Sequence, residues 1–579
     1  MLALFKFLII FISITLVSSF SPSNSRHRTL RITDQRNIMG LGRKIAVESE
    51  TLPLLSRGGD SSTTNNEGIS MKQYMLQDSS RSEKKSSTSS STSSLGETTG
   101  EKILGLAIPA LGALLIDPLM TLADTVFVGR YSDTADALAG MGSAAALLTS
   151  TFFVFNFLCT ATTPLVASRR ASGKESDALL LGGQALTLAL ALGAVVAIGL
   201  LVLQQPLLAD MGTGITGPIA NGYATDFLVT RALAAPAIFC ISASTGVLRG
   251  YLDTKTPIVV LVVANSVNIA LDIVLVAGMG MGPFGAAIAT TTAEWISAFL
   301  FLCVLAGKLP SAGGELGSNQ QAVELTELSS LSSSGTTVPL TVVPALAIPP
   351  WEEVKPLIVA SSSVFLRLAS LQLSLLAAAA MAARGGDILP GGASASVAAH
   401  QIAIQLWILC SFICDALAAA SQGLIADALG REDKEDARDI TKTVFSYSLA
   451  QGVFLGAALY VGDLSGFLVG AFTTDESTQI ALSSILALIV VAQPLNSFVF
   501  AADGVLQGAS EFTYQAKTMA LSAAVAFASF VFLQGINEAD TLVHVWSALI
   551  ILQLMRGLTA LVKVVESEGP IDIMARTKI

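Results

Sequence analysis

The sequence predicts an all-α polytopic membrane protein, with twelve transmembrane helices in two six-helix lobes that are related by a parallel repeat. Composition gives the first reason: 52% of the 579 residues are hydrophobic and 13% are charged, whereas a soluble domain has about 25% charged residues. The second reason is a series of apolar stretches, each long enough to cross a bilayer. The third is that the second half of the chain repeats the first.

The repeat is most visible in two short motifs. Residues 246–250 read GVLRG and residues 504–508 read GVLQG, and Pro236 and Pro494 precede them at the same spacing of 258 residues. Hydrophobic spans that recur in the same order are characteristic of transporters built from two parallel halves around a central site. The repeat therefore predicts a transporter architecture.

Twelve apolar stretches are the expected transmembrane helices. Several exceed the ~20 residues that a bilayer needs, so tilted helices or loose boundaries are expected. The stretches cover residues 103–128, 137–166, 178–204, 224–247, 256–278, 284–306, 353–383, 394–427, 440–470, 478–502, 513–534 and 541–565. These define an N-terminal lobe at 101–307, a polar linker at 308–350, a C-terminal lobe at 351–565 and a tail at 566–579.

The first 100 residues have the composition of targeting and low-complexity segments. Residues 1–19 hold a lysine, a short apolar run and small residues, as in a signal peptide. Residues 20–100 are first basic and hydroxyl-rich, like a transit peptide, and then Ser/Thr-rich and expected to be disordered. The combination resembles the bipartite presequence of algae with secondary plastids. It predicts a plastid envelope; a plain signal peptide would instead indicate an endomembrane or the plasma membrane.

The charges of the loops predict an orientation. Alternate loops, beginning with the one after the second span, carry twelve basic residues, whereas the remaining loops carry Arg130 and Arg384. Basic residues concentrate on the cytosol-like side of a membrane. That side, a stroma in the plastid case, is therefore expected to hold the loops with these residues: Arg169, Arg170, Lys174, Arg249, Lys255, Lys308, Lys355, Arg431, Lys434, Arg438, Lys442 and Lys517.

Two carboxylates in the first half are candidates for binding a coupling cation. Ionisable residues inside a membrane span are costly and mark a pathway or an ion pair. Asp124 lies late in the first span, and Asp272 lies inside the fifth, one helical turn after Asn268, whose amide is placed to hydrogen-bond its carboxylate. The structural alternatives are a turn cap or an Arg130 pair for Asp124, and a polar clasp between helices for Asp272.

Other polar residues of the spans are candidates for a substrate cavity or a gate. Asn265, Thr290 and Glu294 extend the polar surface of the fifth and sixth spans, although threonines often serve helix packing. Arginine stays charged, so a buried arginine needs a carboxylate partner or an anionic substrate. Prolines in the first helix can bend it. The candidates are Arg231, Arg367 and Asp415 for the cavity, and Pro109 and Pro118 for gating.

Several functional classes lack support in the sequence. The acidic residues behind the net charge of -10 are spread over loops and tails, which gives no basis for nucleic acid as a partner. The five cysteines lie in apolar segments and match no metal-ligand pattern. With no Walker or HExxH motif, neither an enzyme nor a cofactor is expected.

Several motifs together resemble the MATE (multidrug and toxic compound extrusion) transporters. The resemblance covers about 101–565 and is strongest to DinF-like bacterial members and plant plastid-envelope members. It rests on Pro109, Asp117-Pro118, ADTVFVGR at 123–130, ATTPLVA at 161–167, GVLRGYLDTKTP at 246–257, Asn268 with Asp272, and GAAIAT at 285–290.

The resemblance implies antiport of an organic solute by alternating access between two lobes. It also implies that Asp124 and Asp272 bind the coupling cation and that Asn268 assists. Members that use a glutamate in the seventh helix have no counterpart here, where Val364-Phe365-Leu366-Arg367 supplies a cation, so protons are favoured over sodium. The expected partners are the bilayer and a small solute, with an anion slightly favoured, and the expected unit is a monomer. The alternatives are a lipid-linked flippase and a non-transporting receptor or scaffold.

Overall fold

The computed structural model describes the membrane-spanning part of the chain as helices joined by short connections. The described residues are 98–131, 135–210, 218–310, 312, 342–343, 351–383, 392–473, 475–536, 541–567 and 569–574. The expected signal and transit segments therefore lie outside the described residues, as do most of the expected linker and part of the tail.

The described part of the first half contains five long helical spans and one bent helix pair, where six continuous spans were expected. α3 holds both Pro109 and Pro118 inside one continuous helix. The elements are α3 (Thr99–Tyr131), α4 (Ala135–Val154), α5 (Phe157–Ala171), α6 (Glu175–Val202), α7 (Gln204–Asp210), α9 (Pro218–Ala232), α10 (Ala235–Gly250), α11 (Lys255–Asp272), the π-helix η2 (Ile273–Gly278) and α12 (Gly282–Leu305).

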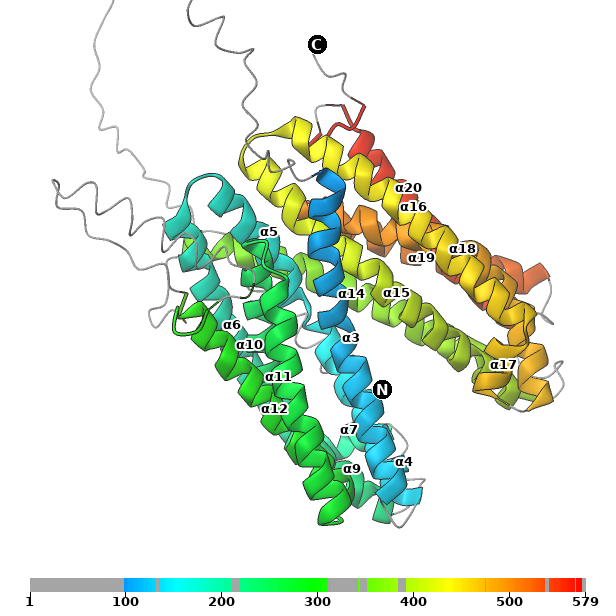
Figure 1. Cartoon of the computed structure of the whole chain (residues 1–579). Coiled ribbons are helices and arrows are strands. Elements are labelled where there is room, and N and C mark those ends of the chain that lie inside the picture. The colour runs from blue at the N-terminus through cyan, green and yellow to red at the C-terminus, as the bar shows by residue number, and fades with distance from the viewer. Residues whose placement is uncertain are drawn as a thin grey trace, which may run out of the picture. The chain divides into compact units, whose positions relative to one another are not determined.

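The second half repeats this arrangement with fewer interruptions. Its elements are α14 (Trp351–Ala382), α15 (Gly392–Gly430), α16 (Lys434–Leu464), α17 (Phe467–Phe472), α18 (Glu476–Gly508), α19 (Phe512–Ile536) and α20 (Thr541–Val565). In Figure 1 the cyan-to-green helices of the first half group together, and so do the yellow-to-red helices of the second half.

Within the described residues, eleven helices are long and apolar enough to span a membrane, and a bent pair brings the number to as many as twelve. The bent pair is α9 and α10, which meet at 47°. Pro236 stands at the start of α10, where its missing N–H costs no hydrogen bond. The expected all-α fold with about twelve spans is confirmed, and the fourth span differs from the expectation in being broken rather than continuous.

The repeat also appears as equivalent contacts between helices. A Cβ added to Gly193 of α6 would lie 2.4 Å from the Cα of Pro236, and one added to Gly452 of α16 would lie 2.5 Å from the Cα of Pro494. The two prolines are equivalent in the repeat. In each half, therefore, a glycine lets one helix approach the proline backbone of another, as close packing in lipid requires.

The two halves meet where α5 and α3 pack against α15 and where α14 packs against α5; the contact between α5 and α15 includes two hydrogen bonds. The hydroxyl of Ser172 donates to the carbonyl of Gly430 (3.0 Å), and the Gln422 amide donates to the carbonyl of Thr160 (2.6 Å). Ser172 and Gly430 are themselves separated by 258 residues, so equivalent segments of the repeat face each other. We call this end of the helices, which carries the basic loops around Arg170 and Arg431, the basic end.

Alanine at Gly193 or Gly452 is expected to destabilise the protein. The added methyl has no room against the proline backbone, and overpacking of this kind costs about 1–3 kcal/mol. The matched control is Gly105→Ala in α3, where an added Cβ meets nothing within 4 Å and alanine is the better helix former. Thermal unfolding in detergent, followed by size-exclusion chromatography, should show a lower melting temperature for the first two variants only; an equal shift in all three would refute the packing argument.

Candidate coupling site in the first half

The site is centred on the Asp124 carboxylate, which lies late in α3 and is 5% exposed. Thr290 of α12 donates its hydroxyl proton to one carboxylate oxygen (2.8 Å), and Asn268 of α11 donates its amide to the other (3.3 Å). Three helices thus converge on one buried carboxylate. Asp124, Asn268 and Thr290, three of the candidates selected from the sequence, are therefore in direct contact.

Asp272 completes the group and has no exposed surface. It is the last residue of α11, and the π-helix η2 follows it directly; short π segments inside helices occur frequently at functional sites. Neither Asp272 oxygen meets a hydrogen-bond donor among the described residues. The Asp124 carboxyl is its neighbouring acid, so the ionisation of one acid affects the other.

The expected pairing of Asn268 with Asp272 is wrong. Although the two residues are one turn apart in α11, the Asn268 amide donates across to Asp124 in α3. Its carbonyl oxygen, like both Asp272 oxygens, lacks a hydrogen-bond donor within the described part of the chain. The site thus has three buried oxygens without donors, an arrangement that a proton or a hard cation with oxygen ligands would satisfy.

Arg231 and Glu294 form an ion pair beside this group. Both guanidinium Nη atoms of Arg231 bond the Glu294 carboxylate, one of them at 2.7 Å. Arg231 lies in the last turn of α9, just before the break in the fourth span, and its charge also acts on Asp117 and Asp124. The carboxylate partner foreseen for Arg231 is therefore Glu294, and three acids, Glu294, Asp124 and Asp117, act on this one arginine.

The remaining candidates of the first half, Asn265, Pro109 and Pro118, act within their own helices rather than in the group around Asp124. The Asn265 amide donates to the Leu261 carbonyl one turn earlier (2.9 Å). Near the prolines of α3, Thr121 and Thr125 donate their hydroxyls to carbonyls one turn earlier. Such bonds are typical where a proline disturbs the backbone ladder. Pro109 and Pro118 thus lie in the helix that carries Asp124, on its N-terminal side.

The candidates of the second half lie elsewhere. Arg367 of α14 pairs with Asp503 of α18, and Arg556 of α20 bonds the same carboxylate. Asp415 of α15 lies in the field of Arg249, Arg367 and Asp503. Arg367 and Asp415 therefore belong to a second charged group. The sequence shows each of these residues as an ionisable residue in a span but contains no signal that joins them.

Across the described ranges, no group of three or more His, Cys, Asp or Glu side chains could hold a metal ion. The five cysteines are free thiols.

Comparisons with known proteins agree with this architecture. A family model described as MatE matches residues 109–274 and 390–533, one segment in each half of the repeat. Protein DETOXIFICATION 43 of Arabidopsis thaliana is 28% identical over 82% of this chain and 92% of its own length. Protein DETOXIFICATION 44, chloroplastic, of the same plant is 30% identical over 79% and 80%.

Solved structures extend the agreement to the fold. A crystal structure of MATE in the bent conformation superposes with a TM-score of 0.67 at 18% identity, and it covers 81% of this chain and 94% of the other. At that identity the superposition speaks for the fold alone. With the family model matched across both halves, this chain belongs to the MATE family of membrane transporters.

Proposed function

We propose that this protein is an antiporter that exports a small organic solute in exchange for protons, and that Asp124 and Asp272 carry the exchanged proton. The observation that supports the proposal best is the buried carboxyl pair with its three oxygens that lack donors. Two neighbouring buried carboxylates are costly to keep ionised together, because like charges repel and each loses hydration, and the nearby Arg231 is already paired with Glu294. Protonation is the simplest way to relieve this cost.

A change of protonation would act on helix packing. With a proton between them, the two acids hold α3 to the end of α11; without it, the same pair repels. Asp124 also holds α12 through Thr290 and α11 through Asn268. A helix containing two prolines and a neighbouring π segment can take up such a change by bending. Protonation is thereby linked to the arrangement of the first half.

The charges in the second half favour protons over sodium as the coupling ion. The Arg367 guanidinium stands in the seventh span, with Asp503 and Arg556 around it, and a guanidinium excludes a cation from that place. In the first half the oxygens around Asp124 would also accept sodium, as hard cations bind carboxylate, amide and hydroxyl oxygens. The ion dependence of transport decides between them.

A plastid envelope is the proposed location, with an endomembrane or the plasma membrane as the alternative. The composition of residues 1–100 supports it, and so does the chloroplastic designation of the relative DETOXIFICATION 44. A fusion of residues 1–100 to a fluorescent protein should enter plastids. Fluorescence confined to the endoplasmic reticulum or plasma membrane would exclude this location.

Solute-driven proton movement in vesicles tests the proposed exchange. The full chain is reconstituted into liposomes that contain a pH-sensitive dye and hold an imposed pH gradient. We expect tetraethylammonium, succinate or both to dissipate the gradient, at a rate unchanged when choline replaces sodium. Dissipation that follows the sodium gradient would assign coupling to sodium. No flux of either solute, together with movement of a labelled lipid-linked sugar, would favour a flippase, and no flux of any kind a receptor or scaffold.

A further inference from the structure

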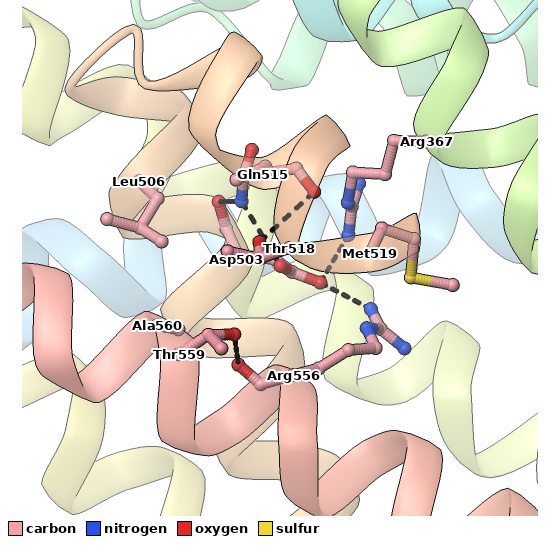
Figure 2. A pocket seen from close by; sticks show the side chains of 9 residues that line it. All are labelled: Arg367, Asp503, Leu506, Gln515, Thr518, Met519, Arg556, Thr559 and Ala560. Carbon is pink, nitrogen blue, oxygen red and sulfur yellow. Dashed lines mark hydrogen bonds and ion pairs between the residues drawn. The ribbon is translucent and has the colours of Figure 1, made fainter. Parts of the chain in front are cut away.

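A second buried charged group lies in a pocket of the second half (Figure 2). Arg367 and Arg556 approach the Asp503 carboxylate from different helices, and Gln515 of α19 donates its amide to the other oxygen of the same carboxylate (3.1 Å). The exposed fractions of Arg367, Asp503 and Arg556 are 9%, 9% and 7%. Leu506, Thr518, Met519, Thr559 and Ala560 complete the lining.

The charges of this pocket do not balance. Two guanidinium groups face one carboxylate, which leaves an excess of one positive charge. Asp415 of α15 acts on the group and is itself in the field of Arg249 as well as Arg367, so counting Asp415 and Arg249 together leaves the excess at one positive charge. A buried cation that is not neutralised is costly, so an excess guanidinium in a pocket favours an anion.

The hydrogen bonds of the pocket are also incomplete. Arg556 bonds Gln553 through Nη1 and Asp503 through Nη2, but its buried Nε meets no acceptor among the described residues. The hydroxyls of Thr518 and Thr559 donate to carbonyls of their own helices, so guanidinium N–H groups are the donors that a ligand would meet. Planar forks of N–H donors match the oxygens of a carboxylate.

The two halves therefore place groups of opposite sign on equivalent helices. The acidic group of the first half lies on α3, α9, α11 and α12, and the basic group of the second half lies on α14, α18, α19 and α20, the corresponding members of the repeat. Asp503 lies five residues before the end of α18, and that end belongs to the basic end of the molecule. The pocket around Asp503 therefore lies closer to the basic end of the molecule than the midpoint of α18 does.

We propose that this pocket binds a carboxylate group of the transported solute, which makes the substrate an organic anion. Leu506, Met519 and Ala560 form the apolar part of the lining. In the absence of solute, Asp503 neutralises one of the two arginines and competes with the incoming carboxylate. The inference rests on the proposed transport function, and it assigns the anion to the second half and the proton to the first.

Equilibrium binding of radiolabelled carboxylates to the full chain in lipid nanodiscs tests the proposal. Succinate or benzoate is expected to bind saturably, whereas succinamide, which lacks the charge, and tetraethylammonium do not compete. Arg556→Gln and Arg367→Gln should each weaken binding about tenfold, the loss expected for a charge-assisted hydrogen bond. Asp503→Asn should tighten binding severalfold because the competing carboxylate is gone. The control is Arg431→Gln, whose arginine pairs with Asp427 and Asp436 in a loop.

Two sets of results would overturn the proposal. In the first, neither carboxylate binds, or binding is the same in both arginine variants while size-exclusion profiles stay normal. In the second, Asp503→Asn binds more weakly and melts at a lower temperature, as expected for a purely structural brace. The same measurements distinguish a failure of the anion pocket from a failure of the proposed function. Succinate that binds without gradient-driven flux would refute the coupling alone. Gradient-driven flux of tetraethylammonium without succinate binding would refute the anion pocket alone.

Discussion

Replacing Asp272 with asparagine is expected to abolish proton-driven exchange, by at least a hundredfold, while the protein still folds and inserts. Asparagine keeps the shape of the side chain but cannot gain or lose a proton, so the pair with Asp124 loses its two states. The buried position, without exposed surface, tolerates an uncharged amide better than a charge. Solute-dependent collapse of a pH gradient in proteoliposomes measures the effect, and size-exclusion chromatography checks the fold.

Asp124→Asn should give the same loss of exchange, with an additional cost. The new amide faces the Asn268 amide and the Thr290 hydroxyl, which donate to this position, so one donor–donor contact is expected and the melting temperature should fall. Asp439→Asn, at an exposed carboxylate of α16, is the matched control and should exchange normally. Full gradient-driven exchange in both Asp124→Asn and Asp272→Asn would exclude the pair as the coupling site.

Much of the fold follows from patterns that are local in the sequence. Apolar length predicts the spans because a bilayer sets the length of a helix, and each of the twelve predicted stretches overlaps a helix or the bent pair. The break between α9 and α10 was not predicted. It lies within one continuous apolar stretch, and the only local signal is Pro236, a residue that continuous membrane helices also tolerate.

The candidate site was predicted less completely than the fold. Family resemblance selects Asp124, Asp272 and Asn268, and the structure brings them together, but the hydrogen-bond partner of Asn268 depends on how α11 is rotated toward α3. Helical spacing alone places its amide near Asp272, whereas it donates to Asp124. Partners across helices depend on tertiary packing, which a single sequence does not encode as a local pattern.

The pairing of charges shows the same limit. Arg231 and Glu294 are separated by 63 residues, and Arg367 and Asp503 by 136. From sequence, each arginine predicts an unnamed anionic partner. In the structure, Arg231 pairs with Glu294. Arg367 instead shares the carboxylate of Asp503 with Arg556. This difference, visible only after folding, separates a structural ion pair from a candidate binding pocket.

Valine at Gly430 is expected to hold the two halves apart at the basic end and to reduce exchange about fivefold or more. A Cβ at this position would lie 2.6 Å from the carbonyl oxygen of Ser168 and 2.8 Å from the Cβ of Ala171, so α5 and α15 cannot keep their present contact. In the alternating access that the family resemblance implies, this contact is expected to form and break in every cycle. A steric penalty of about 1–3 kcal/mol against the closed arrangement moves a two-state equilibrium about fivefold to more than a hundredfold toward the open one.

Spin labels at Lys174→Cys and Glu435→Cys, in a background whose five native cysteines are replaced, would report this change directly. Both positions are exposed and flank the contact between Ser172 and Gly430. The distance distribution should shift to longer values in Gly430→Val, and the exchange rate should fall with it. Gly142→Val in α4, where an added Cβ meets nothing within 4 Å, should leave both unchanged. Normal exchange in Gly430→Val with an unaltered distance would show that this contact does not need to close tightly, and alternating access would then have to be sought in the movement of α3 alone.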